Sequence, residues 1–245
     1  MNSYNQIAIH EMKQWQVKMS KKPFFLSGIP KAMQNKMNSL IPEKAHNIIT
    51  GAIKNMLKAV LYGSEVTTSM PMLKGSLEIR EKKVQEKIDF YKNAATLSGA
   101  GTGAGGFFLG LADFPILLSL KIKFLFEVAN LYGFDMKDYK ERLYVLYVFQ
   151  LAFSSQERRN EIFNEVLNWE EYAKTLPNDI NAFDWRKFQQ EYRDYIDLAK
   201  MLQLVPGIGA AVGAYANYKL MNQLGETAMN AYRLRVYNLG RLQDS

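Results

Sequence analysis

The sequence predicts an all-α fold: a compact bundle of about nine or ten helices around a central glycine-rich helix pair. Apolar residues recur at the three- and four-residue spacing of helices almost throughout the 245 residues. No run of alternating apolar and polar residues bounded by hairpin turns indicates a sheet. A chain of this length can bury a sizeable core without disulfides, and this one contains no cysteine.

The first helix is predicted from an apolar stripe of Ile7, Met12, Trp15 and Met19, and it stops before Pro23. Pro42 stands at the first position of the next helix, which runs to Leu61 and closes at Gly63-Ser64. Pro71 is expected to start a third helix. Its apolar stripe is Leu77, Val84, Ile88 and Tyr91, and its solvated face carries Glu78, Glu81, Lys82, Lys83, Glu86, Lys87 and Asp89.

Residues 93–112 are uncharged and rich in glycine, and at Asp113-Phe114-Pro115 the chain is expected to turn into an apolar helix that ends at Gly133. A helix of such length spans about 30 Å, the thickness of a bilayer's hydrocarbon or the diameter of a domain. Asp113 needs polar partners there, either as the N-cap of the helix after Pro115 or as an ion or proton site.

The later helices follow the same signals. One covers residues 141–153, and Ser154-Ser155-Gln156-Glu157 is a capping box for a helix that reaches about Ala173. Asp184 caps a further helix, and Pro206-Gly207 introduces a long last one.

Two small-residue motifs, Gly106-x-x-x-Gly110 and Gly209-x-x-x-Gly213, each begin a long helix. Small residues four positions apart let helix backbones approach closely, so we predict that these two helices pack on each other. The pair lies either in the core or in the bilayer. Residues 97–120 and 201–218 are weak autonomous spans, which favours the core and leaves membrane insertion, or a switch between the two, as alternatives.

The positive charge is concentrated in the first third of the chain. Residues 1–92 hold 15 Lys and Arg against 7 Asp and Glu, whereas residues 93–245 hold 16 against 17. We divide the chain into a basic amphipathic N-terminal segment, 1–34, and a helical domain, 35–245. The segment mixes aromatic and basic residues as membrane-interface candidates: Trp15, Lys18, Lys21, Lys22, Phe24 and Phe25.

The excess of basic over acidic residues in the first third therefore predicts an anionic membrane surface as partner, with a solvated lysine-rich face as the alternative. Nucleic acid fits worse, because Arg80 is the only arginine among these fifteen basic residues.

The sequence gives little support for nucleotide binding, metal binding or acid–base catalysis. Residues 101–106 match G-x-G-x-x-G, but no strand precedes them, so no nucleotide cofactor is predicted. His10 and His46 fall on different helices without further ligands at metal spacing, so no metal site is predicted. Glu170-Glu171 is interpreted as solvated charge, and no catalytic residue can be nominated from spacing.

Several blocks carry a family resemblance. In order along the chain, the blocks are Ile41-Pro42-Glu43-Lys44, Ile53-Lys54, Leu61-Tyr62-Gly63-Ser64-Glu65, Gly101-Thr102-Gly103-Ala104-Gly105-Gly106, Gly110-Leu111-Ala112-Asp113-Phe114-Pro115, Leu131-Tyr132-Gly133-Phe134-Asp135 and Val205-Pro206-Gly207-Ile208-Gly209-Ala210. With these the chain resembles the EcsC family. The resemblance implies a bacterial α-helical protein of a family whose founding gene neighbours those of an ABC transporter, and it carries over no catalytic or ligand residue.

These observations lead us to expect a non-enzymatic accessory protein in the cytoplasm, peripheral at the inner membrane face, since the opening residues show no export signal. Integral insertion, a protein-binding module for a transporter or secretion complex, and an enzyme with an unrecognised site remain as alternatives.

Overall fold

The computed structural model describes residues 3–21, 43–62, 70–102, 107–154, 158–184, 186, 188 and 210–241. Eight α-helices and one 3₁₀ helix lie in these ranges, which contain no strand. The all-α class is therefore confirmed, with eight helices in the described ranges against nine or ten expected for the whole chain. The helices are α1 (Ser3–Ser20), α3 (Glu43–Tyr62), α4 (Leu77–Thr102), α5 (Phe107–Leu131), α6 (Tyr139–Phe153), α7 (Arg159–Leu167), α8 (Trp169–Thr175) and α11 (Ala210–Asn238), with the 3₁₀ helix η2 (Ile180–Ala182).

The most deeply buried helix is α6. All its residues except Lys140 and Glu141 are buried, and it contacts α3, α5, α7 and α11. A helix that is apolar on every side needs neighbours all around, so α6 forms the centre of this part of the fold. Its first turn is closed by Asp138, whose side chain accepts a hydrogen bond from the backbone N–H of Lys140.

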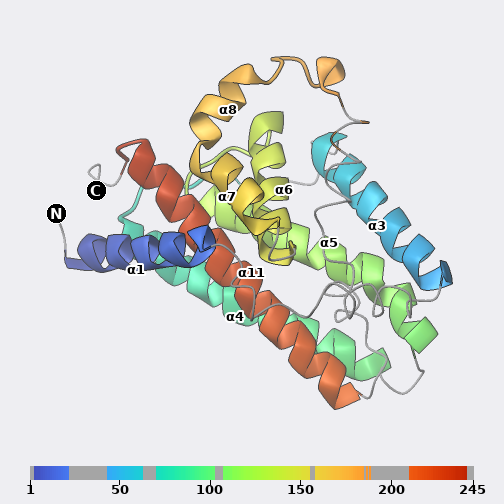
Figure 1. Cartoon of the computed structure of the whole chain (residues 1–245). Helices are drawn as coiled ribbons and strands as arrows, with labels where there is room; N and C mark the ends of the chain where they lie inside the picture. The colour runs from blue at the N-terminus through green and yellow to red at the C-terminus, as the bar shows by residue number, and fades with distance from the viewer. Residues whose placement is uncertain are drawn as a thin grey trace.

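The most extensive contact between two helices joins α4 and α11, which run side by side in opposite directions (Figure 1). Gly225 of α11 lies directly against Ile88 of α4, where an added Cβ would be 2.8 Å from the Ile88 Cγ1 atom. A small residue thus permits close helix packing, as the sequence suggests, at a position that the glycine motifs do not include.

The predicted glycine pair stays a prediction. Gly106 and Gly209 lie outside the described residues. Gly110 and Gly213 fall within α5 and α11, but the structure does not describe their surroundings. The division between residues 34 and 35 also lies outside the described ranges, while α1 itself packs on α4, α7 and α11.

The turn predicted at Asp113-Phe114-Pro115 is wrong. Helix α5 runs without a break from Phe107 to Leu131 with Pro115 inside it, so Asp113 is not the N-cap of a later helix. Proline removes one backbone donor from the helix interior. Phe114, Leu117 and Leu118 are almost completely buried around it, and their burial offsets that loss.

Two helix boundaries also differ from expectation: one helix starts later, and another is divided. Helix α4 begins at Leu77 and not at Pro71, because Ser76 provides the cap: its hydroxyl accepts from the Ile79 N–H at 3.4 Å. The helix expected from residue 154 to about Ala173 is divided into α7 and α8 at Asn168. The Asn168 side chain donates to the Asn164 carbonyl at 3.0 Å, which competes with continued helix at this point.

The predicted place of Pro42 at the start of a helix stays a prediction, because Pro42 lies outside the described residues and α3 is described from Glu43. The predicted end of α5 is confirmed. Gly133 follows α5 with φ +88°, and the N–H of Phe134 returns to the Ala129 carbonyl at 3.0 Å, as in a glycine-terminated helix. Among the helices that the structure describes, none combines the length and apolar character needed to cross a bilayer.

Candidate functional site

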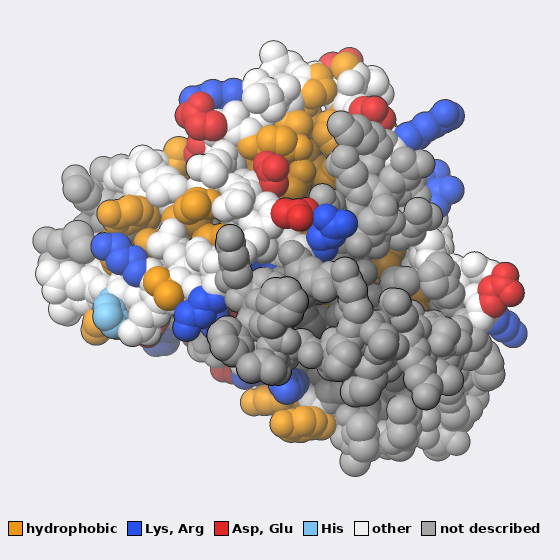
Figure 2. Space-filling model, viewed as in Figure 1, with side chains coloured by type: hydrophobic (Ala, Val, Ile, Leu, Met, Phe, Trp, Pro, Cys, Tyr) orange, Lys and Arg blue, Asp and Glu red, His pale blue; other side chains and the backbone are white. Residues whose placement is uncertain are grey.

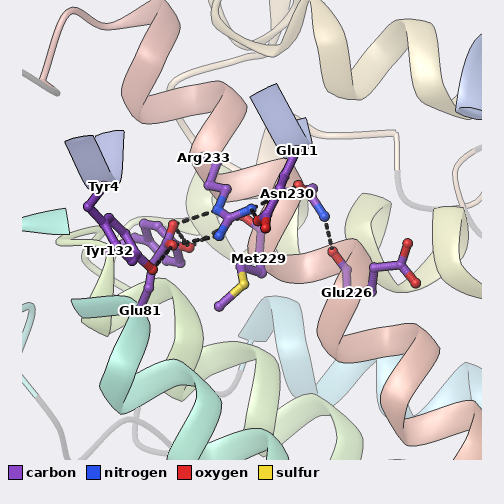
Figure 3. A network of polar contacts seen from close by, with 8 residues as sticks. All are labelled: Tyr4, Glu11, Glu81, Tyr132, Glu226, Met229, Asn230 and Arg233. Atoms are coloured by element: carbon purple, nitrogen blue, oxygen red, sulfur yellow. Dashed lines mark hydrogen bonds and ion pairs between the residues drawn. The ribbon is translucent and has the colours of Figure 1, made fainter. Parts of the chain in front are cut away.

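A buried ion pair joins α4 to α11. Arg233 of α11 donates from Nε to Oε1 of Glu81 and from Nη2 to Oε2, both at 2.7 Å. The hydroxyls of Tyr132 and Tyr4 donate to the same oxygens at 2.9 and 2.6 Å. The third nitrogen, Nη1, donates to Glu11 of α1 at 2.7 Å. Figure 3 shows these side chains, here called the Glu81 centre, converging from different helices.

The Glu81 centre corrects the expectation that Glu81 belongs to a solvated face, since it is 1% exposed. Burial and then the hydrogen bond to Glu81 raise the pKa of Tyr4, and burial followed by the charge of Glu81 raises the pKa of Tyr132. Burial alone would lower the pKa of Arg233, but its bonds to Glu81 raise it above the ordinary value. These three groups therefore keep their protons at neutral pH.

A carboxylate offers about four lone-pair positions, and Glu81 uses them for four donors. No acceptor position is left for a substrate. The geometry is that of a clasp that holds α1, α4 and α11 together with the end of α5.

A second arginine, Arg235, links α11 to α6 and α8. It pairs with Glu141 through two guanidinium nitrogens and donates to Glu170 at 2.8 Å. Its guanidinium carbon lies 4.1 Å from the ring centre of Phe134 and 4.5 Å from that of Tyr144. Glu170 is therefore an ion-pair partner and not only a solvated charge. The combination of a planar cation, two carboxylates and two rings fixes the end of α11.

Arg142 of α6 ties the end of α3 to the turn between α5 and α6. Its Nη2 donates to the Leu61 carbonyl at the end of α3 at 2.8 Å, and its Nη1 donates to the Met136 and Lys137 carbonyls at 2.8 and 2.7 Å. The Leu61 carbonyl lies at a helix C-terminus, where carbonyls lack partners within the helix, and the guanidinium supplies a donor for it. Arg142, Arg233 and Arg235 thus all stabilise the fold.

Lys121 of α5 differs from these arginines. It is 1% exposed, and in the part of the chain that the structure describes its ammonium has no hydrogen-bond partner. Burial lowers the pKa of Lys121 to about 8. An uncompensated ammonium in the core destabilises the fold, because burial removes its hydration.

A shallow groove of about 660 Å³ lies between α1 and α7. Lys13, Val17 and Lys21 are spaced four residues apart along its α1 side, and Phe163 and Leu167 of α7 form its other side. Val17 is 59% exposed, and both lysines are exposed. Figure 2 shows basic and hydrophobic side chains mixed over the surface of α1. We call this feature the α1–α7 groove.

The membrane-interface candidates separate into three groups. Lys18 and Lys21 are exposed, and Lys18 pairs with Glu226 of α11 at 3.1 Å. Trp15 is 3% exposed and packs edge-on against Phe163, so its ring lies in the core and not on the surface. Lys22, Phe24 and Phe25 lie outside the described residues, and the side chain of Asp113 is also not described.

The ion pairs were missed because their members are distant in sequence. One signal was present: Arg233 and Arg235 alternate with Tyr232, Leu234 and Val236 in the last helix, where a charged residue is surrounded by apolar neighbours. Buried charges are normally paired, so arginines in this context predict buried carboxylates. Within the described ranges, no three His, Asp or Glu side chains are grouped so that they could hold a metal ion.

Comparisons with known proteins give a consistent result. The model described as the EcsC protein family matches residues 6–237. The chain is 45% identical over 233 residues to Protein EcsC of Bacillus subtilis (strain 168), covering 95% of this chain and 96% of that protein. It is 30% identical over 229 residues to Uncharacterized protein YdbA of the same organism, covering 89% and 84%. No solved structure matches the chain.

Proposed function

The chain belongs to the EcsC family, and from this premise we propose that it is a non-enzymatic accessory protein that docks on the anionic inner face of the bacterial membrane. The α1–α7 groove is the observation that carries the proposal. It presents two lysines on either side of an exposed valine. A basic and apolar stripe of this kind suits a surface of anionic headgroups over hydrocarbon.

The strength expected from this contact is moderate. Each lysine near an anionic leaflet contributes about 1 kcal/mol, and an inserted valine contributes about 1.5 kcal/mol or more. Lys13, Lys21 and Val17 together give weak, reversible and salt-sensitive attachment. The remaining basic residues of the first third add to this attraction when they face the same surface.

The kind of basic residue also favours lipid over nucleic acid. Arg80 is the single arginine among the fifteen basic residues of the first third. Its guanidinium is already used, because it donates to the Gly75 carbonyl at 3.0 Å and to the Leu131 carbonyl at 3.4 Å. Lysine attracts anionic headgroups as a compact point charge, but it lacks the planar, bidentate donor geometry that favours arginine in base recognition.

The polar interior supports an accessory role and not an enzymatic one. The Glu81 centre and Arg235 direct their hydrogen bonds at other helices. Their donors and acceptors hold the bundle together, and in these two clusters of the described ranges they are committed to contacts between helices and not to activating a nucleophile or base.

Vesicle co-sedimentation of the full chain tests the proposal. We expect binding to vesicles that contain phosphatidylglycerol, weaker binding to pure phosphatidylcholine, and release as the salt concentration rises. The double variant Lys13→Glu/Lys21→Glu should lose most of the binding. A matched control is Lys137→Glu/Lys174→Glu, which makes the same change in charge at two exposed lysines outside the basic third.

Equal binding to both vesicle types, or equal loss in the test and control variants, would refute docking through this groove. A protein crosslinked to Lys13 or Lys21 in cells, without any vesicle binding, would favour the alternative of a protein-binding module for a transporter or secretion complex.

A further inference from the structure

A second hollow, of about 330 Å³, lies on another side of α1. Its walls come from α1, α6, α7 and α11, and it shares no lining residue with the α1–α7 groove. Three cationic side chains and one carboxylate line it: Lys18, Arg159, Lys219 and Glu226. We call it the Arg159 pocket.

The charges in the Arg159 pocket do not cancel. Lys18 and Glu226 neutralise each other through their ion pair of 3.1 Å. Arg159 and Lys219 have neither an ion pair nor a hydrogen bond from their side chains to any residue of the described ranges. The pocket therefore presents about two uncompensated positive charges at neutral pH.

Arg159 is unusual among the arginines of this protein. It is partly buried, and burial lowers its pKa with no carboxylate acting in the opposite direction. Arg142, Arg233 and Arg235 are also buried, but each has acceptors within hydrogen-bond distance. A guanidinium that is partly desolvated and lacks an acceptor gains charge-assisted hydrogen bonds when an anion binds to it.

Two further features add donors to the same wall. Arg159 is the first residue of α7, and the N-terminus of this nine-residue helix has no side-chain cap. Glu161 in the first turn pairs with Arg158, so the backbone N–H groups at the start of α7 remain as hydrogen-bond donors next to Arg159. Trp15 is buried in the pocket wall, and its indole N–H has no acceptor in the part of the chain that is described.

We propose that the Arg159 pocket binds a phosphomonoester group. Such a group carries close to two negative charges at neutral pH and accepts hydrogen bonds from several directions, which matches a guanidinium, an ammonium and a helix N-terminus. A carboxylate would satisfy Arg159 alone and leave Lys219 uncompensated. The pocket volume exceeds that of phosphate, so it also accommodates the small group to which the phosphate is attached.

The phosphomonoester can come from a soluble metabolite or from a lipid headgroup. The inference does not depend on docking through the α1–α7 groove, because the two hollows have separate linings. The variant Lys13→Glu/Lys21→Glu should therefore retain phosphate binding even where it loses vesicle binding.

Isothermal titration calorimetry of the full chain with inorganic phosphate, at constant ionic strength in chloride, tests the pocket directly. We expect the dissociation constant to rise about tenfold or more in Arg159→Gln and in Lys219→Gln, since each change removes a charge-assisted contact. Arg158→Gln is the matched control, because Arg158 is the adjacent residue, pairs with Glu161 at 3.1 Å and does not line the pocket. Lys219 is exposed, so its variant tests the pocket even where Arg159→Gln fails to fold.

Two probes distinguish the source of the phosphate. Glycerol 3-phosphate binding that depends on Arg159 assigns a soluble phosphate ester. Binding to phosphatidic acid vesicles that depends on Arg159, without binding of glycerol 3-phosphate, assigns a lipid headgroup. The proposal is overturned when no probe binds the unaltered protein, or when Arg158→Gln weakens binding as much as Arg159→Gln does.

Discussion

Arg233 and Glu81 are 152 residues apart in the chain and form two parallel hydrogen bonds of 2.7 Å inside the protein. The pair connects the charged helix α4 with the last helix α11, and Tyr4 and Glu11 add α1 to the same contact. The N-terminal and C-terminal helices are thus fixed to each other by a buried polar contact, in addition to the exposed Lys18–Glu226 ion pair.

Glu81→Gln should reduce the free energy of unfolding by about 3–5 kcal/mol, measured by urea denaturation. The variant leaves the buried guanidinium of Arg233 with only Glu11 as a charged partner. Glu86→Gln is the control, since Glu86 is an exposed carboxylate on the same helix, and we expect it to change stability by less than about 0.5 kcal/mol.

Replacing both partners tests whether the loss comes from the pair. Glu81→Met/Arg233→Met should be more stable than the sum of its single variants predicts, by about 1–3 kcal/mol, because neither charge is then buried alone. If the two single changes in the free energy of unfolding simply add up in the double variant, Glu81 and Arg233 do not act as a pair.

Gly225→Ala should destabilise the α4–α11 interface by about 1–3 kcal/mol, because the new Cβ would lie 2.8 Å from Cγ1 and 2.9 Å from Cδ1 of Ile88. Thermal unfolding followed by circular dichroism measures the effect. Ile88→Val in the Gly225→Ala background should restore part of the stability by removing the nearest methyl group.

Gly51→Ala is the control for this substitution. Gly51 lies within α3, and an added Cβ there meets nothing within 4 Å. Alanine is the better helix former, so the control should raise the free energy of unfolding by about 0.5–1 kcal/mol. Stabilisation by Gly225→Ala would show that α4 and α11 are farther apart than described.

Local signals in the sequence predicted much of the fold. The stripe of α4 is buried at all four predicted positions, and Gly133 ends α5 in the left-handed conformation that glycine favours. Both features depend on neighbours within one or two turns. The division of α7 from α8 was not predicted, because it depends on a single asparagine side chain that bonds to its own helix.

The candidate site was harder to predict, because helical periodicity locates an apolar stripe but not what covers it. Trp15 lies on the same helical face as Met12 and Met19. An apolar face of this kind can pack in a protein core as well as it can contact a membrane. Arg159 gives no signal at all in the sequence. Its importance lies in having no ion-pair partner within the described ranges, since the one carboxylate that lines the pocket, Glu226, pairs with Lys18, and only the packing of α1, α7 and α11 determines this arrangement.

Arg235→Lys should reduce the free energy of unfolding by about 2 kcal/mol or more, although it preserves the charge. Lysine cannot reproduce the paired bonds to Glu141 or stack between Phe134 and Tyr144. Arg241→Lys is the control, since Arg241 is exposed and lies 5.5 Å from the centre of the Phe134 ring. Chemical denaturation that gives equal values for both variants would contradict a special role for the stacked guanidinium.

Lys121→Met should stabilise the protein at pH 7 and lose this advantage as the pH rises. Burial lowers the pKa of Lys121 from 10.5 to about 8, so between these values the unfolded state binds the proton more tightly than the folded state. The charged lysine therefore destabilises the fold by about 3 kcal/mol below pH 8, and this penalty disappears as the pH rises toward 10.5. Urea denaturation at pH 7 and pH 10 measures the difference, with the exposed neighbour Lys123→Met as control. A loss of stability at pH 7 in Lys121→Met would mean that the ammonium has a compensating partner, and the pH dependence would then have the opposite sign.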